Sequence, residues 1–353
     1  MNEPVNPLYS NIRKLLIYAR HTAVCNVNTL QVLTNFEIGR LIVEHEQKGA
    51  QRAKYGEQIL KELSKRLTSE FGRGFSWRNL NHKRRFYLEY NDRVQQYTDS
   101  RLLPGNLPNI LQTPSAKSYA PFPLSWSHYV FLMGINNQNE RNFYEIESIS
   151  GNWSLRELKR QNSSGLYERL ALSRDKEKVK ELSARGQLIE KPEDILKNPY
   201  VLEFLGLDEK SAYSENDLET AIINKIEHFL LELGKGFLFE ARQKRFTFDE
   251  DHFFVDLVFY NRLLRCYVLI DLKIGKLTHQ DLGQMQMYVN YFDRYVKLED
   301  ENPTIGILLC KQKSDALVEL TLPEKSNIYA SQYQLYLPSK EVLRQKLIEW
   351  TLE

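Results

Sequence analysis

Two acidic residues and one lysine interrupt an apolar segment in the C-terminal half of the chain. Asp256, Asp271 and Lys273 lie within residues 253–273, FFVDLVFYNRLLRCYVLIDLK, whose other residues are typical of two buried strands. An ionised carboxylate in an apolar layer is strongly unfavourable unless it is paired or binds a metal ion. The segment therefore contains either a structural ion pair or a functional site.

The spacing of these residues is compatible with a metal site. Side chains alternate across a strand, so Asp271 and Lys273 are expected on one face. Asp256 precedes Asp271 by fifteen residues, and a turn at Asn261-Arg262 would place it on the neighbouring strand of a hairpin. Adjacent carboxylates repel each other unless a cation intervenes, and oxygen ligands favour Mg²⁺ or Mn²⁺ over zinc.

The chemistry predicted for such a site is phosphodiester hydrolysis. A bound Mg²⁺ retains water molecules and lowers their pKa, which makes one of them a candidate nucleophile. Lys273 could orient that water, accept its proton, or offset phosphate charge. The alternative is an Asp–Lys ion pair at a sheet edge, and the spacing alone does not choose between the two.

The composition excludes several other protein classes. Of the 353 residues, 42% are hydrophobic and 27% are charged, which is typical of a globular chain long enough for two domains. The three cysteines have no CxxC spacing, which argues against a disulfide framework or a zinc knuckle. The chain shows no secretory signal and no apolar run of membrane-spanning length. We therefore expect a soluble cytoplasmic protein without membrane association.

The first 190 residues predict an all-α domain. Apolar spacing indicates amphipathic helices over residues 8–21, 26–47 and 55–71, followed by a glycine-containing turn and a basic helix over residues 77–90. This order resembles a helix-turn-helix, so DNA contacts are predicted for four basic residues: Arg78, Lys83, Arg84 and Arg85. The alternative is a bundle helix with a solvated basic face. Five prolines make residues 98–123 a predicted loop or disordered insert.

Residues 191–353 predict a second domain, of the α/β type, so the fold is α+β overall. Helices are expected over residues 194–207, 215–234 and 277–296, with a last helix over 339–350. Runs rich in Val, Phe and Tyr predict strands over residues 237–248, 252–261, 263–273, 304–312 and 328–339. This order predicts a sheet flanked by helices.

The motifs of this segment resemble those of a known family. Val255-Asp256 followed by Asp271-Leu272-Lys273, with a helix before and after the strands, resembles the PD-(D/E)XK nuclease core, which has a restriction-endonuclease-like mixed sheet. Over nearly its whole length the chain resembles the YhcG family of bacterial PD-(D/E)XK proteins. FLLELGKGFLFEARQKR and GQMQMYVNYFD are similar to the family's C-terminal domain, and GFSWRNL, LSWSHY, RNFYE and WSLRELKRQ to its N-terminal domain.

The resemblance implies roles for individual residues. Asp256 and Asp271 would bind the metal ion together with the Leu272 backbone carbonyl, and Lys273 would be the catalytic lysine. The family more usually has Glu at the position of Asp271. An acidic residue of the preceding helix often completes such sites as a metal ligand, and Glu219 is chosen over Glu227 and Glu232; the alternative is a charge that stabilises the helix start. Gln243, with Arg242, and Gln284 are further candidates for contacts with nucleic acid.

The function implied is that of a Mg²⁺- or Mn²⁺-dependent DNA endonuclease. Its substrate could be branched DNA, a recombination or repair intermediate, or foreign DNA, and by family analogy it would act as a homodimer. The N-terminal domain would bind DNA or a protein partner. The rival hypothesis is a catalytically weak DNA-binding or assembly protein that uses the nuclease fold as a platform. A third is a helix-turn-helix regulator that dimerises through its C-terminal half.

Overall fold

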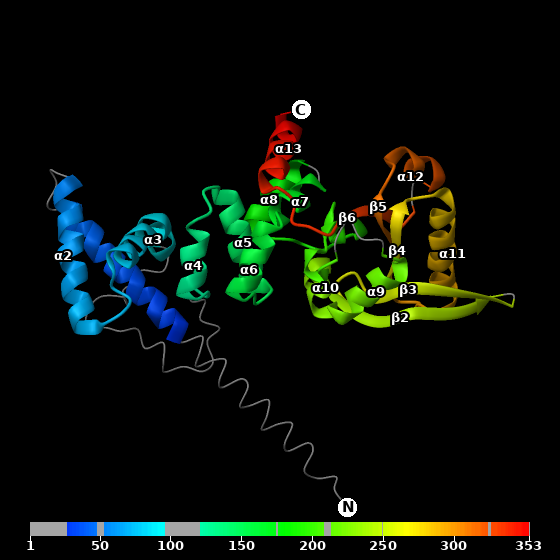
Figure 1. Cartoon of the computed structure of the whole chain (residues 1–353), viewed down its shortest axis with the longest axis horizontal. Helices are drawn as coiled ribbons and strands as arrows, with labels where there is room; N and C mark the ends of the chain where they lie inside the picture. Colours follow the sequence, from blue (N-terminus) through cyan, green and yellow to red (C-terminus); the bar gives the residue numbers. More distant parts are fainter. Residues whose placement is uncertain are drawn as a thin grey trace, which may run out of the picture. The chain divides into compact units, whose positions relative to one another are not determined.

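The structure, a computed structural model, divides by its contacts into two compact units (Figure 1). It describes residues 27–47, 53–95, 121–173, 176–207, 213–248, 250–323 and 326–352. Unit one comprises residues 1–141 with 152–155, and unit two comprises residues 142–151 with 156–353. The helix predicted over residues 8–21 and the insert predicted over 98–123, apart from residues 121–123, lie outside the described residues. The domain boundary at residue 190 stays a prediction.

Unit one is helical, as its apolar periodicity predicts. A helix over residues 27–47 is followed by α2 (Ala53–Phe71), α3 (Trp77–Gln95) and α4 (Trp126–Leu132). Gly72 and Gly74 form the turn between α2 and α3 with φ angles of 77° and 119°, a conformation that glycine adopts at little cost. Phe86 packs against Phe122 and Tyr129 in an aromatic core. The predicted all-α N-terminal region is confirmed.

Unit two contains a mixed six-stranded sheet with the order β1-β6-β5-β4-β3-β2. Antiparallel pairing joins β2, β3 and β4, and parallel pairing joins β4, β5, β6 and β1. The strands are β1 (Tyr200–Val201), β2 (Phe237–Phe248), β3 (Asp251–Asn261), β4 (Cys266–Lys276), β5 (Ile305–Gln312) and β6 (Ile328–Gln334). The predicted α/β domain with a mixed sheet is confirmed.

Helices cover both faces of this sheet. One face packs against α9 (Glu215–Asn224) and α10 (Ile226–Leu233) through Leu218, Ile222 and Phe229. The opposite face packs against α11 (His279–Tyr295) and α12 (Asp315–Thr321). Other helices of the unit are α5 (Gln138–Ser150, from Asn142 onward), α6 (Leu155–Ser163, from Arg156), α7 (Leu166–Leu172), α8 (Lys176–Arg185) and α13 (Lys340–Leu352). In the described ranges, no helix is both long and apolar enough to cross a membrane.

Two predicted helices are wrong in detail. The helix expected over residues 215–234 is broken at Lys225, whose φ of −125° separates α9 from α10. The apolar spacing continues across the break, so periodicity does not reveal it. Residues 194–207 form two 3₁₀ turns, Pro192–Ile195 and Glu203–Leu205, with β1 between them. Pro199 has no N–H to donate and disfavours helix at the residue before it, which prevents a continuous helix there.

Candidate active site

The hairpin of β3 and β4 brings Asp256 and Asp271 together. Asn261 Oδ1 stabilises its turn by accepting hydrogen bonds from the N–H groups of Leu263 (3.0 Å) and Leu264 (3.2 Å). The turn predicted at Asn261-Arg262 is thereby confirmed. Strand pairing at the site end stops at Leu257 and Ile270, and one further step in this register brings Asp256 opposite Asp271.

Beyond that last pair, the link between β3 and β4 is a hydrogen bond to a side chain rather than one between backbone groups. Asp256 Oδ2 accepts a hydrogen bond of 2.9 Å from the N–H of Leu272, the residue between Asp271 and Lys273. The Asp256 carboxylate of β3 is therefore bonded to the backbone of β4 just beyond the last β3–β4 pair, where β4 still pairs with β5. Two acids from adjacent strands meet at one place, as the spacing predicts.

Asp271 has a strongly perturbed acidity. It is 3% exposed, and burial together with the nearby Asp256 raises its pKa to about 7. Lys273 opposes this shift, because its Nζ lies 2.9 Å from Asp271 Oδ2. One lysine does not compensate two adjacent carboxylates.

Lys273 interacts with acidic residues of three elements. Besides Asp271, its Nζ lies 3.8 Å from Glu215 Oε2 on α9 and 3.8 Å from Asp281 Oδ1 on α11. Burial disfavours its charge, but Asp271, Glu215 and Asp281 outweigh burial and raise the pKa of Lys273. Sequence reasoning missed Glu215 and Asp281. Their signal was local: Thr278 and Asp281 form a capping box that starts α11, and Glu215 opens α9 after its Ser214 cap.

Glu219 reaches the site indirectly. It is buried on α9, and its Oε1 accepts a hydrogen bond from Arg242 Nε while its Oε2 accepts one from Gln243 Nε2. The same Gln243 nitrogen lies 2.9 Å from Asp256 Oδ1. Gln243 thus joins Glu219 to Asp256. A direct role for Glu219 in metal binding stays a prediction.

On the α11 side, Gln284 is exposed and donates a hydrogen bond from Nε2 to the hydroxyl of Tyr288. Burial and the nearby Asp271 raise the pKa of Tyr288 to about 12, so this hydroxyl is neutral at ordinary pH. Gln243 therefore contacts the acidic pair directly, whereas Gln284 contacts Tyr288. Their contact with nucleic acid stays a prediction.

The basic residues predicted to bind DNA lie on α3 of unit one. Lys83 is buried with its Nζ 4.1 Å from the centre of the Phe75 ring, and burial lowers its pKa. Arg84 pairs with Glu46 at 2.7 Å and Arg85 with Glu89 at 2.6 Å, whereas Arg78 is exposed. Lys83 therefore faces the protein interior rather than a solvated face. DNA contact by these four residues stays a prediction.

The donor set at the acidic pair suits a hard divalent ion. Across the described residues, no group of three His, Cys, Asp or Glu side chains converges in a way that could hold a metal ion. Asp256 and Asp271 supply two carboxylates, and the predicted third ligand is the Leu272 carbonyl. Mg²⁺ is usually bound by one or two carboxylates and keeps several waters. The residues present therefore fit Mg²⁺ better than an ion that needs a full set of protein ligands.

A second group of buried charges in unit two has a different character. Glu232 is fully buried, with its Oε1 2.6 Å from Arg169 Nη1 and its Oε2 3.6 Å from Arg160 Nη2. Lys197 Nζ donates to the Glu232 backbone carbonyl. Although burial opposes its charge, Arg169, Lys197 and Arg160 lower the pKa of Glu232 to about 2. We call these four residues the buried ion cluster. Because Glu232 is paired in this cluster, we interpret it as a structural residue and not as part of the candidate active site.

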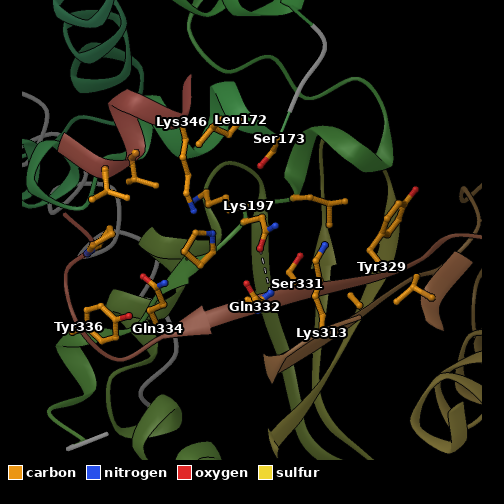
Figure 2. A pocket seen from close by; sticks show the side chains of 18 of the residues that line it. Leu172, Ser173, Lys197, Lys313, Tyr329, Ser331, Gln332, Gln334, Tyr336 and Lys346 are labelled. Carbon is orange, nitrogen blue, oxygen red and sulfur yellow. Dashed lines mark hydrogen bonds between the residues drawn. The ribbon is translucent and has the colours of Figure 1, made fainter. Parts of the chain in front are cut away.

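A cavity of about 760 Å³ in unit two lies between the end of α7, α13 and β6 (Figure 2). Lys346 and Lys313 project into it, and the Asn198 side chain accepts a hydrogen bond from the Gln332 N–H at its wall. Within the part of the chain that the structure describes, its lining contains no Asp or Glu. The acidic pair remains the candidate for catalysis.

Comparison with known proteins agrees with this placement. Residues 193–348 match the model of the YhcG PDDEXK nuclease domain, and residues 11–169 match that of the DUF1016 N-terminal domain. Over 97% of its length, the chain is 41% identical to "Putative nuclease YhcG" of Escherichia coli (strain K12), and the match covers 93% of that protein. A crystal structure of a repair endonuclease from Pyrococcus abyssi is similar over 36% of this chain and 50% of that one, with 20% identity and a TM-score of 0.24, which is too low to support an argument.

The acidic pair, Lys273 and the sheet that carries them all lie inside the matched nuclease domain. The relative matches both units of the chain and not the nuclease domain alone. The chain therefore belongs to the YhcG family, and its C-terminal part is a PD-(D/E)XK nuclease domain.

Proposed function

We propose that this protein is a Mg²⁺- or Mn²⁺-dependent endonuclease that hydrolyses phosphodiester bonds in DNA. The observation that carries the proposal is the meeting of Asp256 and Asp271 beside Lys273, at the point where β3 and β4 stop pairing. Two adjacent carboxylates with one shared ammonium are an incompletely compensated anionic site, and a divalent cation compensates it. The nuclease domain of the family supplies the reaction class.

Asp256, Asp271 and the Leu272 carbonyl would hold the ion. When bound, a Mg²⁺ ion stabilises charge on a phosphate and lowers the pKa of a coordinated water. Lys273 is assigned as a charge donor: its ammonium lies close to three carboxylates. It can donate hydrogen bonds to the attacking water or to a phosphate oxygen.

The finer assignments concern substrate and assembly. We propose DNA as the substrate. The classes of DNA to test are branched repair or recombination intermediates and foreign DNA. Unit one would bind DNA or a protein partner, and exposed Arg78 is its clearest candidate for a phosphate contact. A homodimer would supply two sites for cutting both strands of a branched substrate. Phosphate contacts by Lys and Arg would make DNA retention fall steeply with salt.

The test is metal-dependent cleavage of supercoiled, linear and branched DNA in Mg²⁺, Mn²⁺ or EDTA. Asp256→Asn and Asp271→Asn are expected to reduce the cleavage rate at least about a hundredfold, as loss of a group that stabilises the transition state does. Lys273→Arg keeps the charge and is expected to lose less. Glu181→Gln, at an exposed ion pair of α8, is the control and should cleave normally.

Cleavage by Asp271→Asn at the normal rate would contradict the catalytic assignment. If the protein retains DNA at low salt but cuts none of the substrates with any metal ion, the rival hypothesis of a DNA-binding platform replaces it.

A further inference from the structure

Gln243 connects two carboxylates that would otherwise repel each other. Its Nε2 atom donates to Glu219 Oε2 and, at 2.9 Å, to Asp256 Oδ1. A side-chain amide nitrogen carries two hydrogens, so each carboxylate receives one of them. The other oxygen of Asp256 accepts from the Leu272 N–H. The Asp256 carboxylate is therefore held by one donor on each oxygen.

The backbone of Gln243 is adapted to this contact. Its φ of 47° lies in the left-handed region, which is uncommon for a residue other than glycine and costs about 1 kcal/mol or more. Successive side chains of a regular strand point to opposite faces, yet both Arg242 and Gln243 contact Glu219. The left-handed backbone accounts for this, because it turns the Gln243 side chain toward α9 and β3.

Glu219 has both oxygens occupied by donors. Arg242 Nε contacts Oε1, and Gln243 Nε2 contacts Oε2, while the residue is 2% exposed. Arg242 additionally donates to the Thr220 hydroxyl at 2.9 Å. Glu219 is thus anchored to β2 in the same manner as a structural carboxylate, with its link to the site running through Gln243.

We propose that Gln243 is a positioning residue that orients Asp256 for metal binding, and that Glu219 supports the site by anchoring Gln243 rather than by binding the ion. This inference rests on the proposed function. Under this inference Gln243 acts on Asp256 and not on nucleic acid. Its neutral amide lies between the carboxylates of Glu219 and Asp256. Partners that orient a metal ligand typically change metal affinity about 10- to 100-fold when they are removed.

The experiment measures thermal unfolding of the full-length protein during a titration with Mn²⁺, without DNA. Gln243→Gly removes the amide but permits the left-handed backbone, and Gln243→Asn permits that backbone with an amide too short to reach both acids. Both variants are expected to unfold close to the wild-type temperature without metal, and to need about 10- to 100-fold more Mn²⁺ for half the maximal rise. Gln345→Ala removes a remote glutamine that also donates to a glutamate, and should behave as wild type.

Glu219→Gln separates the two roles of Glu219. It removes the charge and keeps one acceptor oxygen, which can serve either Arg242 or Gln243 but not both. The Mn²⁺ midpoint is expected to move less than in Gln243→Gly. A larger shift than in Gln243→Gly would show that Glu219 binds the ion directly, and would overturn this part of the proposal.

Cleavage kinetics provide the second measurement. At saturating Mn²⁺, Gln243→Gly should recover most of its kcat with an unchanged KM for DNA, because Asp256 is still present. A raised KM with a wild-type Mn²⁺ midpoint would identify Gln243 as a DNA contact instead. A wild-type protein that does not respond to Mn²⁺ would defeat the proposed function, whereas a responding wild type with an equal midpoint in Gln243→Gly would defeat only this inference.

Discussion

The acidic pair and the buried ion cluster of unit two each contain one buried carboxylate, but the two carboxylates are compensated differently. Glu232 is completely buried and Asp271 is 3% exposed. Three cations lower the pKa of Glu232 to about 2, whereas burial and Asp256 raise the pKa of Asp271 to about 7 against a single lysine. Burial alone therefore does not identify a functional acid; the balance of nearby charge does.

The two regions also differ in what they connect. The buried ion cluster joins α10 to α6, α7 and the start of β1, since Val201 N–H donates to Glu232 Oε1 at 3.0 Å and Arg169 Nη1 donates to the Pro199 carbonyl at 2.9 Å. Its charges compensate one another, because Arg169, Arg160 and Lys197 all lie close to Glu232. The acidic pair lies at the end of paired strands and has oxygen atoms left for an added cation. The first region holds charges that compensate one another, and the second is the candidate site for an added cation.

The largest effect is expected from breaking the buried ion cluster. Glu232→Ala leaves buried Arg169 and Lys197 without the carboxylate that compensates them, which should lower the free energy of unfolding by about 3–5 kcal/mol. Arg160 is half-buried and keeps its pair with Glu203. Urea unfolding measures the change. The exposed pair partner Glu181→Ala is the control and should change stability by less than about 0.5 kcal/mol. A loss below about 1 kcal/mol for Glu232→Ala would contradict the difference between the two regions.

An intermediate effect is expected when Mg²⁺ is added to the protein. Mg²⁺ at about one hundred times its Kd should stabilise the wild-type protein by about 2.7 kcal/mol, because it binds the folded state only. Asp271→Asn removes one of the two carboxylates and should abolish most of this gain. Thermal unfolding with and without Mg²⁺ checks both statements. Equal stabilisation of the variant would place the ion elsewhere in the protein.

The smallest effect concerns pH in the absence of metal. The raised pKa of Asp271 means that the folded state binds its proton more tightly than the unfolded state, so its stabilising contribution is complete below about pH 4 and is lost as pH rises toward 7. Asp271→Asn has no such titration and should be more stable than wild type by about 1 kcal/mol at pH 8, although Lys273 loses its nearest partner.

Glu232 should titrate in the opposite sense. Its lowered pKa makes its contribution complete above about pH 4.5 and lost only as pH falls toward 2. Urea unfolding of wild type, Asp271→Asn and Glu232→Gln across pH 2–8 resolves the two signs, because Glu232 titrates below about pH 4.5 and Asp271 above about pH 4. A wild-type minus Asp271→Asn difference that is flat with pH would show that Asp271 is not perturbed.

Much of the nuclease domain could be predicted from the sequence, because strands with apolar alternation have local signals. The strand predicted over residues 237–248 has those bounds in the structure, and the turn after Asn261 brings Asp256 to Asp271. Contacts set by side-chain geometry had no such signal. Gln243 required a left-handed backbone within a strand, and Glu232 finds Arg169 63 residues earlier in the chain. Periodicity reports which face a residue occupies but not which partner it meets.

The contacts of Lys273 affect the choice of an inactive variant for capturing a complex with uncut nucleic acid. Because Glu215 at the start of α9 and Asp281 at the start of α11 share its ammonium with Asp271, deleting this amine would set three acids against one another and loosen the beginnings of both helices. An inactive variant made at either aspartate keeps that junction closed. Complexes with uncut nucleic acid should therefore be sought with Asp256→Asn or Asp271→Asn rather than with Lys273→Ala.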